Sequence, residues 1–337
     1  MKRINNIYDQ INSFENIHNA YLKAKKGKCY KKEVLEFSAR LEENLIEIHN
    51  ELQYGSYKTG TYKKFKVYDP KERLILALPF KDRVVHHALN NIIEPIFDSK
   101  FIFDSYACRK NKGSIAAMKR LRKFIDIESI KGEKVYYLKA DVAKYFYSID
   151  HDVLKALVRR KIKCQKTLAL IDNIIDSTEN PGIPIGNLSS QLFANIYLDA
   201  LDHKIKDDWG IKSYVRYMDD FIILSKSKSL LRDLLYDIYF ILKKLKLNFN
   251  KKTRIDTINR GIDFVGYRLF ASFTLLRKRI YRKNTRKFKK FSRLYLHGNI
   301  EQKRIRQSID SLLGICKHCQ SFRARENILK NLVLCHG

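Results

Sequence analysis

This sequence lacks the patterns of membrane-spanning segments, disulfide frameworks and flexible linkers. No apolar run approaches the roughly 20 residues of a membrane-spanning helix, which predicts a soluble protein that does not associate with membranes. The 6 cysteines are scattered and follow no secretory signal, so we expect reduced thiols and a cytoplasmic location. With 13 Gly and 5 Pro and no repeat or low-complexity stretch, the subdomains are expected to pack together.

Acidic residues are scarce relative to basic ones. Against 36 Asp and Glu stand 67 Lys and Arg, a formal charge of +31 that is spread along the whole chain. This excess predicts a polyanionic partner, most simply nucleic acid, because Lys and Arg contacts to phosphates release counterions. A solvated basic surface kept for solubility is the alternative. Hydrophobic residues make up 45% of the 337 residues, enough for a globular protein of two or three subdomains.

Two of the acidic residues are adjacent, within the stretch VRYMDDFIIL. Asp219 and Asp220 lie between apolar, β-branched segments that predict the two strands of a hairpin. Asp141 ends another apolar strand pattern, VYYLKAD. Neighbouring antiparallel strands can bring Asp141 and Asp219 together, and their carboxylates could then hold two Mg²⁺ ions about 3.5–4 Å apart for an in-line phosphoryl transfer. Taken alone, an Asp-Asp pair is more often a solvated turn.

Strand patterns cluster in the middle of the chain and helical patterns at both ends, which predicts an α+β fold. Residues 1–52 and the chain from about residue 284 onwards are expected to be helical, and residues 62–83 to form a basic hairpin. The helix written DHDVLKALVRRKI has two candidate capping residues, Asp150 and Asp152.

The YMDD stretch between strands resembles the catalytic hairpin of reverse transcriptases, and LKADVAKYFYSID resembles the strand that supplies their other metal-binding aspartate. Further stretches match the family in the same order between about Tyr62 and Tyr267: DPKERLILALPFKDRVVHHAL, GIPIGNLSSQLFANIYL, LKLNFNKKTRI and FVGY. A basic segment that we expect to be helical follows them. The chain is therefore identified as similar to reverse transcriptases over most of its length.

This resemblance implies a right-hand polymerase. N-terminal helices and fingers would occupy residues 1–137, an antiparallel-sheet palm residues 138–270 with a fingers insertion at about 151–182, and a basic helical thumb residues 271–337. The expected activity is RNA-directed DNA polymerisation with two Mg²⁺ ions, and the expected ligands are template RNA, an RNA/DNA duplex and dNTPs. No RNase H or endonuclease domain is expected after the thumb.

The resemblance also implies roles for individual residues. Phe146 would be the steric gate that excludes a ribose 2′-hydroxyl, and Lys252, with Lys251 nearly as good a match, would protonate the leaving pyrophosphate. The resemblance makes Asp141, Asp219 and Asp220 catalytic metal ligands, assisted by the backbone of Val142. Eight residues would bind the dNTP: Lys71, Arg73, Phe146, Ile185, Gly186, Gln191, Met218 and Lys252. Four would form the primer grip: Phe264, Val265, Gly266 and Tyr267.

The nucleotide-binding loop, IGNLSSQ from Ile185 to Gln191, resembles that of diversity-generating retroelements, whose enzymes are group II intron-like bacterial reverse transcriptases. Most families carry Gln where this chain has Ile185, and an apolar side chain there is expected to loosen base selection. The resemblance implies mutagenic copying of a template RNA, with errors at template adenines and a small basic accessory protein oligomer. Two alternatives stay open: an antiviral-defence enzyme that makes DNA from a dedicated noncoding RNA, and a non-catalytic RNA-binding scaffold.

A Cys-x-x-Cys pair near the C-terminus has the spacing of zinc ligands. Cys316 and Cys319 form this pair, and Cys335 and His336 follow downstream. Because the first pair lies in a predicted thumb helix and the second at the terminus, we favour a structural role over a zinc site.

Overall fold

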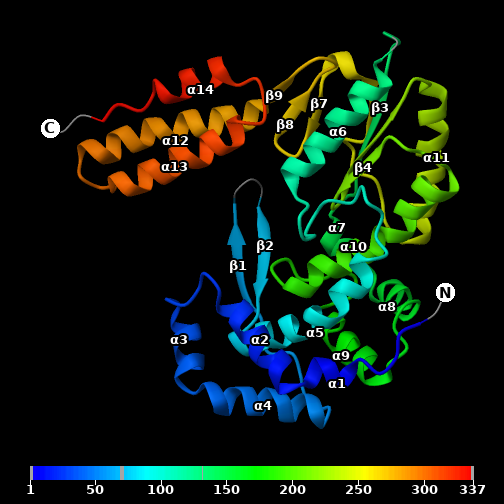
Figure 1. Ribbon diagram of the computed structural model, residues 1–337, viewed down its shortest axis with the longest axis vertical. Coiled ribbons are helices and arrows are strands. Elements are labelled where there is room, and N and C mark those ends of the chain that lie inside the picture. Colours follow the sequence, from blue (N-terminus) through cyan, green and yellow to red (C-terminus); the bar gives the residue numbers. More distant parts are fainter. Residues whose placement is uncertain (1–2, 69–71, 131, 335–337) are drawn as a thin grey trace. The chain divides into compact units, whose positions relative to one another are not determined.

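The computed structural model describes residues 3–68, 72–130 and 132–334, which leaves the expected dNTP-binding residue Lys71 outside the described residues. The chain divides into two compact units, and Figure 1 labels their elements. Unit 1 comprises Met1–Phe103, Val142–Gly210 and Asp237–Lys251. Unit 2 comprises Asp104–Asp141, Ile211–Tyr236 and Lys252–Gly337.

Unit 1 is mainly helical and carries the antiparallel hairpin of β1 (Lys63–Val67) and β2 (Arg73–Ala77). Its helices form because apolar residues recur at helical spacing: α2 buries Ile17, Ala20, Tyr21 and Ala24 and packs on α5. The helices are α1 (Tyr8–Asn12), α2 (Phe14–Lys25), α3 (Lys32–Ala39), α4 (Leu41–Gln53), α5 (Phe80–Asp98), α7 (Tyr145–Ser148), α8 (His151–Arg159), α9 (Gln165–Ile175), α10 (Leu188–His203) and the π-helix η1 (Lys204–Asp208).

Unit 2 is built on a four-stranded antiparallel sheet with the strand order β4-β5-β3-β6. Residues 221–224 of β5 are all buried, as expected for a central strand that is covered on both faces. The strands of this sheet are β3 (Tyr136–Asp141), β4 (Tyr214–Tyr217), β5 (Asp220–Ser225) and β6 (Arg254–Thr257). Helix α6 (Ser114–Glu128) packs on β4 and β5, and a core that includes Tyr137, Val215 and Ile222 lies beneath it.

A second, three-stranded antiparallel sheet in unit 2 has the order β7-β8-β9, formed by Ile262–Phe264, Tyr267–Leu269 and Thr274–Leu276. Helices α12 (Lys278–Leu296), α13 (Gln302–Cys316) and α14 (Phe322–Leu329) follow it and pack together around a separate apolar core (Figure 1). The 3-10 turn η2 (Ile258–Arg260) precedes β7, and α11 (Lys228–Lys244) runs from unit 2 into unit 1.

The turn between β7 and β8 has an unusual backbone. Phe264 pairs with Tyr267, so Val265 and Gly266 form a two-residue turn, with φ of 39° and 97°. Positive φ at both central positions is the pattern of a type I′ turn, which matches the twist of a hairpin. Glycine adopts such a φ readily, whereas a β-branched residue such as Val265 does so at a cost.

The expectation of an α+β fold with antiparallel sheets is confirmed. The expected basic hairpin corresponds to β1 and β2, and Asp150 rather than Asp152 caps α8, because its side chain accepts a hydrogen bond from the Val153 amide. Helix α10 begins at Leu188, within the stretch GIPIGNLSSQLFANIYL. Among the described residues, no helix combines the length and apolar character that crossing a membrane would require.

We predict that Gly266→Ala destabilises the protein by about 1–2 kcal/mol, because alanine at φ 97° is strained and its Cβ would lie 2.9 Å from Ile280 Cδ1. Gly314→Ala is the matched control. Its Cβ would meet no atom within 4 Å and it lies inside helix α13, so it should stabilise by up to about 1 kcal/mol. Urea denaturation measures both, and equal effects of the two substitutions would contradict the turn assignment.

Candidate active site

The turn between β4 and β5 presents the adjacent aspartates. Tyr217 pairs with Asp220, so Met218 and Asp219 form a two-residue turn. Met218 has φ of 58°, whereas Asp219 keeps a negative φ, and positive φ at the first position alone is the pattern of a type II′ turn. Glycine is usual at that position, so a methionine there holds backbone strain of about 1–3 kcal/mol that the surrounding structure must offset.

Arg216 stabilises this turn through a side-chain hydrogen bond. Its side chain is fully buried, and its Nη1 donates a hydrogen bond of 2.9 Å to the carbonyl of Met218. Its own backbone is fixed on both sides, since its amide donates to the Asp104 carbonyl and its carbonyl accepts from the Tyr106 amide, both at 3.0 Å. Sequence reasoning did not single out Arg216. The signal was an arginine inside an otherwise apolar strand, where a charged residue is rarely buried without a specific role.

The structure brings the side chains of Asp141 and Asp219 together. Asp141 ends β3, and Asp219 lies in the turn that precedes β5, the neighbouring strand. The two carboxyl groups lie within hydrogen-bonding distance of each other. Burial, followed by the charge of Asp141, raises the pKa of Asp219 to about 7. The pair therefore ionises fully only at a cost that a bound cation would remove.

Among the described residues, Asp220, unlike Asp141 and Asp219, has a lysine partner. It stands directly opposite Asp141 in the sheet, but its Oδ2 accepts a hydrogen bond of 2.9 Å from Lys139 Nζ. Burial raises the pKa of Asp220 although Lys139 acts in the opposite direction. Its Oδ1 is buried and has no hydrogen-bond partner. Within the described part of the chain, no three His, Cys, Asp or Glu side chains are placed to hold a metal ion together.

The donors at this turn nevertheless suit a hard cation. Two carboxyl groups in contact, and a buried carboxylate oxygen of Asp220 without a partner, offer the oxygen ligands that Mg²⁺ takes. Mg²⁺ needs few protein ligands because water and substrate phosphates complete its shell. Cys316 is buried in the apolar core around α12, α13 and α14, and the Cys319 thiol donates a hydrogen bond to the Cys316 carbonyl at 3.7 Å. Cys335 and His336 lie outside the described residues.

A second group of expected site residues comes together in unit 1. The Ile183 amide donates to the Phe146 carbonyl at 2.8 Å, which joins the turn of Phe146 to the loop before α10. The Leu76 amide donates to the Ile185 carbonyl at 3.1 Å, which joins the same loop to β2. A Cβ at Gly186 would lie 3.2 Å from Ile75 Cγ2, so only glycine allows this close approach of loop and strand.

The other expected residues are placed as follows. Arg73 is exposed at the start of β2, Gln191 is exposed on α10, and Lys252 is exposed before β6. Val142 is buried and forms a β-bridge with Phe249. The four expected primer-grip residues make up the β7–β8 turn and its flanking pair. The Phe146 loop group belongs to unit 1, whereas the aspartates, Met218, Lys252 and the β7–β8 turn belong to unit 2.

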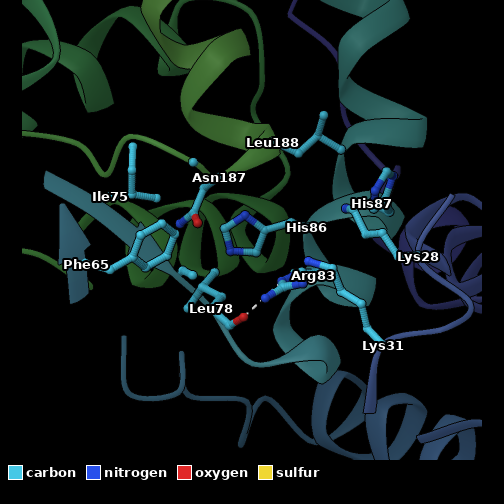
Figure 2. Close-up of a pocket in the computed structure, with 12 residues that line it drawn as sticks. Lys28, Lys31, Phe65, Ile75, Leu78, Arg83, His86, His87, Asn187 and Leu188 are labelled. Atoms are coloured by element: carbon cyan, nitrogen blue, oxygen red, sulfur yellow. Dashed lines mark hydrogen bonds between the residues drawn. The ribbon is translucent and has the colours of Figure 1, made fainter. Parts of the chain in front are cut away.

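A basic pocket of about 250 Å³ lies beside the same loop in unit 1. The imidazole of His86 lies among the side chains of Phe65, Arg83 and Asn187 that line it (Figure 2). Its Nδ1 shares a hydrogen bond of 2.8 Å with Ser189 Oγ, whereas its buried Nε2 has no partner. Burial lowers the pKa of His86 to about 3, so the imidazole is neutral at physiological pH.

Lysines form the rim of this pocket. Lys28 and Lys31 line it together with Arg83, whose guanidinium binds Glu33 at 2.8 Å. Burial, followed by the charges of Arg83 and Lys31, lowers the pKa of Lys28. Burial and the charge of Lys28 lower the pKa of His87 to about 4. Positive charges are therefore crowded here, and a bound anion would relieve their repulsion.

Known proteins match this chain in sequence and in fold. The profile of the family described as "Reverse transcriptase (RNA-dependent DNA polymerase)" matches residues 62–269. Protein YkfC of Escherichia coli K12 is 26% identical in an alignment of 280 residues that covers 68% of this chain and 72% of YkfC. The group II intron-encoded protein LtrA of Lactococcus lactis is 28% identical over 173 residues, covering 48% of this chain but 28% of LtrA.

A solved structure of apo telomerase from Candida tropicalis superposes with a TM-score of 0.55 at 12% identity, covering 81% of this chain and 60% of that one. A truncated form of it superposes with a TM-score of 0.51 at 14% identity. Similarity at this level of identity concerns the fold alone, and it confirms the right-hand polymerase fold that the motifs predict. The sequence matches confirm the wider family, and the diversity-generating type stays a prediction.

We predict that the metal-free protein loses stability as the pH rises toward 7 and that Asp219→Asn weakens this loss. A carboxyl whose pKa is raised on folding binds its proton more tightly in the folded state. Its contribution to the free energy of unfolding is therefore greatest in acid and is lost as the pH rises through its folded pKa. In EDTA at pH 8, Asp219→Asn should increase the free energy of unfolding by on the order of 2 kcal/mol.

Urea denaturation between pH 5 and pH 8 measures this difference. Asp310→Asn on the exposed face of α13 is the matched control and should leave the pH slope unchanged. An unchanged slope in Asp219→Asn would show that the two carboxyl groups are not crowded together in the folded protein.

Proposed function

Because this chain belongs to the reverse transcriptase family, we propose that it copies an RNA template into complementary DNA. The observation that carries the proposal is the contact between Asp141 and Asp219 at the end of two neighbouring strands. Two carboxyl groups crowded in a partly buried position serve no evident structural purpose, whereas a polymerase needs them to hold cations near phosphates. An RNA-binding scaffold without catalysis has no need of this pair.

In the proposed reaction the 3′-hydroxyl of a primer attacks the α-phosphate of a dNTP, and pyrophosphate leaves. Two bound Mg²⁺ ions would supply the chemistry of lowering the pKa of the hydroxyl and balancing the charge of the leaving group. Asp141 and Asp219 would hold them through carboxylate oxygens, assisted by the Val142 backbone and by Asp220. Lys252, or its neighbour Lys251, would donate a proton to the pyrophosphate. Met218 would contact the primer end or the incoming nucleotide.

The residues grouped in unit 1 would select the nucleotide. Phe146 would lie under the sugar and exclude a 2′-hydroxyl, and the loop that binds its carbonyl would present Ile185 and Gly186 to the base pair. The close contact of Gly186 with β2 supports a fixed position for this loop. Arg73, Lys71 and Gln191 would contact the nucleotide from β2, its preceding turn and α10. The β7–β8 turn would hold the primer end.

The basic pocket supports RNA as the template. Its volume of about 250 Å³ exceeds that of a nucleobase, Phe65 offers an aromatic wall, and Lys28 and Lys31 offer charge to a phosphate. We therefore propose that unpaired template RNA passes over this pocket.

For the biological role we propose mutagenic copying in a diversity-generating retroelement, in the cytoplasm and with a small basic accessory protein. Ile185 supports it, because an apolar side chain in the nucleotide loop cannot form the hydrogen bond of a glutamine and so discriminates less among bases. An antiviral-defence enzyme that copies a dedicated noncoding RNA is the alternative. A template and variable repeat pair beside the gene would support the retroelement, and a cluster of defence genes would support the alternative.

We predict that the purified protein extends a DNA primer on an RNA template when Mg²⁺ is present and that Asp219→Asn reduces the rate at least about 100-fold, since a cation ligand is lost. Sequencing of the products checks the biological role: errors concentrated at template adenines are expected. Accurate products would favour the defence alternative. Extension at the wild-type rate by Asp219→Asn would refute the site.

We predict that Phe146→Ala admits ribonucleotides. Removing the ring should improve the ratio of rNTP to dNTP incorporation by about tenfold or more, because the sugar would gain space for its 2′-hydroxyl. Single-nucleotide extension measures kcat/KM for each substrate. Tyr147→Ala, which removes the exposed neighbouring ring, should leave the ratio unchanged. A ratio that moves equally in both variants would argue against Phe146 as the gate.

A further inference from the structure

Lys139 occupies an unusual position for a lysine. It lies on β3 two residues before Asp141 and therefore on the same face of the sheet. Its side chain is only 16% exposed. Its Nζ donates to Asp220 Oδ2 at 2.9 Å and also to the backbone carbonyl of Asp263. One ammonium group thus joins a carboxylate beside the catalytic turn to the backbone of a different sheet.

The second acceptor belongs to the strand that leads into the proposed primer grip. Asp263 is the middle residue of β7, directly before Phe264 and the turn of Val265 and Gly266. The turn is tied once more, because the Arg277 amide donates to the Gly266 carbonyl at 3.1 Å. Lys139 is thus a polar link between the four-stranded sheet and this hairpin, in addition to the apolar core that the two sheets share.

We propose that Lys139 is a positioning residue with two effects, and this inference rests on the proposed polymerase function. First, it fixes the β7–β8 turn relative to the pair of Asp141 and Asp219, and so sets where the primer 3′ end lies. Second, its positive charge offsets Asp220, and so leaves Asp141 and Asp219 as the principal cation ligands.

The burial and geometry of Lys139 distinguish it from an ordinary ion pair of the same unit. Lys226 and Glu133 also lie 2.8 Å apart, but their side chains are 38% and 49% exposed, and water can replace their contact. The side chains of Lys139 and Asp220 are less exposed, at 16% and 28%, and removing the ammonium group would take a partner from two acceptors at once. Lys139 therefore constrains two elements, which an exposed pair does not.

The test uses the full chain and two measurements on Lys139→Met. Mg²⁺ titration followed by thermal unfolding gives the Mg²⁺ concentration of half-maximal stabilisation, and primer extension gives kcat and the KM for primer–template. Losing the ammonium adds net negative charge beside the aspartate pair, so the half-maximal Mg²⁺ concentration should fall roughly threefold to tenfold. The kcat should fall about tenfold or more because the primer end is displaced. General loosening of the fold would weaken Mg²⁺ binding and activity together.

Further variants separate the two effects. Lys139→Met/Asp220→Asn is compared with Asp220→Asn alone, because Asp220 is itself a proposed cation ligand. Relative to that reference, the double variant should need less Mg²⁺ because the lysine charge is gone, and its kcat should be about tenfold lower because the link to Asp263 is missing. Lys139→Arg keeps the charge and the donors and should restore most of the activity. Lys226→Met is the matched control and should change neither quantity.

Lys139→Met with an unchanged Mg²⁺ requirement and an unchanged kcat would overturn the proposal. If that variant does not fold, the comparison of the double variant with Asp220→Asn decides in its place, because neither leaves the Asp220 carboxylate without its partner: equal kcat values in these two variants would overturn the positioning role. If the wild type extends no primer at all, the proposed function fails, whereas the Mg²⁺ requirements of Lys139→Met and the double variant still test the charge effect.

Discussion

The crowding of two carboxyl groups, Asp141 and Asp219, is the constraint on which the rest of unit 2 depends. Burial and mutual repulsion raise the pKa of Asp219 to about 7, so the metal-free protein carries a destabilising contact at neutral pH. The contact persists because the pairing of β3 with β5 places Asp141 directly opposite Asp220, next to the turn. Buried Arg216 holds the turn itself through the carbonyl of Met218. The surrounding sheet thus offsets a cost that a bound cation would remove.

Strained backbone occurs in the β4–β5 turn and in the β7–β8 turn. Met218 and Val265 both have positive φ although neither is glycine, and both lie in two-residue turns that present proposed functional residues. Each turn is braced by a hydrogen bond, from buried Arg216 in one case and from the Arg277 amide in the other. Non-glycine residues with positive φ run against local sequence preference, and they are expected mainly where a functional site needs a fixed geometry.

The sequence predicted what depends on local pattern. Runs of apolar and β-branched residues identified the strand that ends at Asp141 and the two strands that flank Asp219, and ordered motifs identified the family and the fold. It did not predict Lys139 or Arg216, because their roles depend on partners that only tertiary folding brings near: Asp263 lies 124 residues beyond Lys139. Nor did it predict that Asp220 accepts a hydrogen bond from Lys139, since spacing alone does not show which way a side chain turns. Individual nucleotide-binding roles, the domain limits and the retroelement role stay predictions.

The most direct measurement is anomalous X-ray diffraction from crystals in which Mn²⁺ replaces Mg²⁺, because Mn²⁺ takes the same oxygen ligands and its position can be identified by its scattering. The account predicts an anomalous peak bound by both Asp141 and Asp219, with Asp220 still paired to Lys139. A peak elsewhere in unit 2, or none at a saturating concentration, would contradict the claim that the crowded carboxyl pair is the cation site of a polymerase.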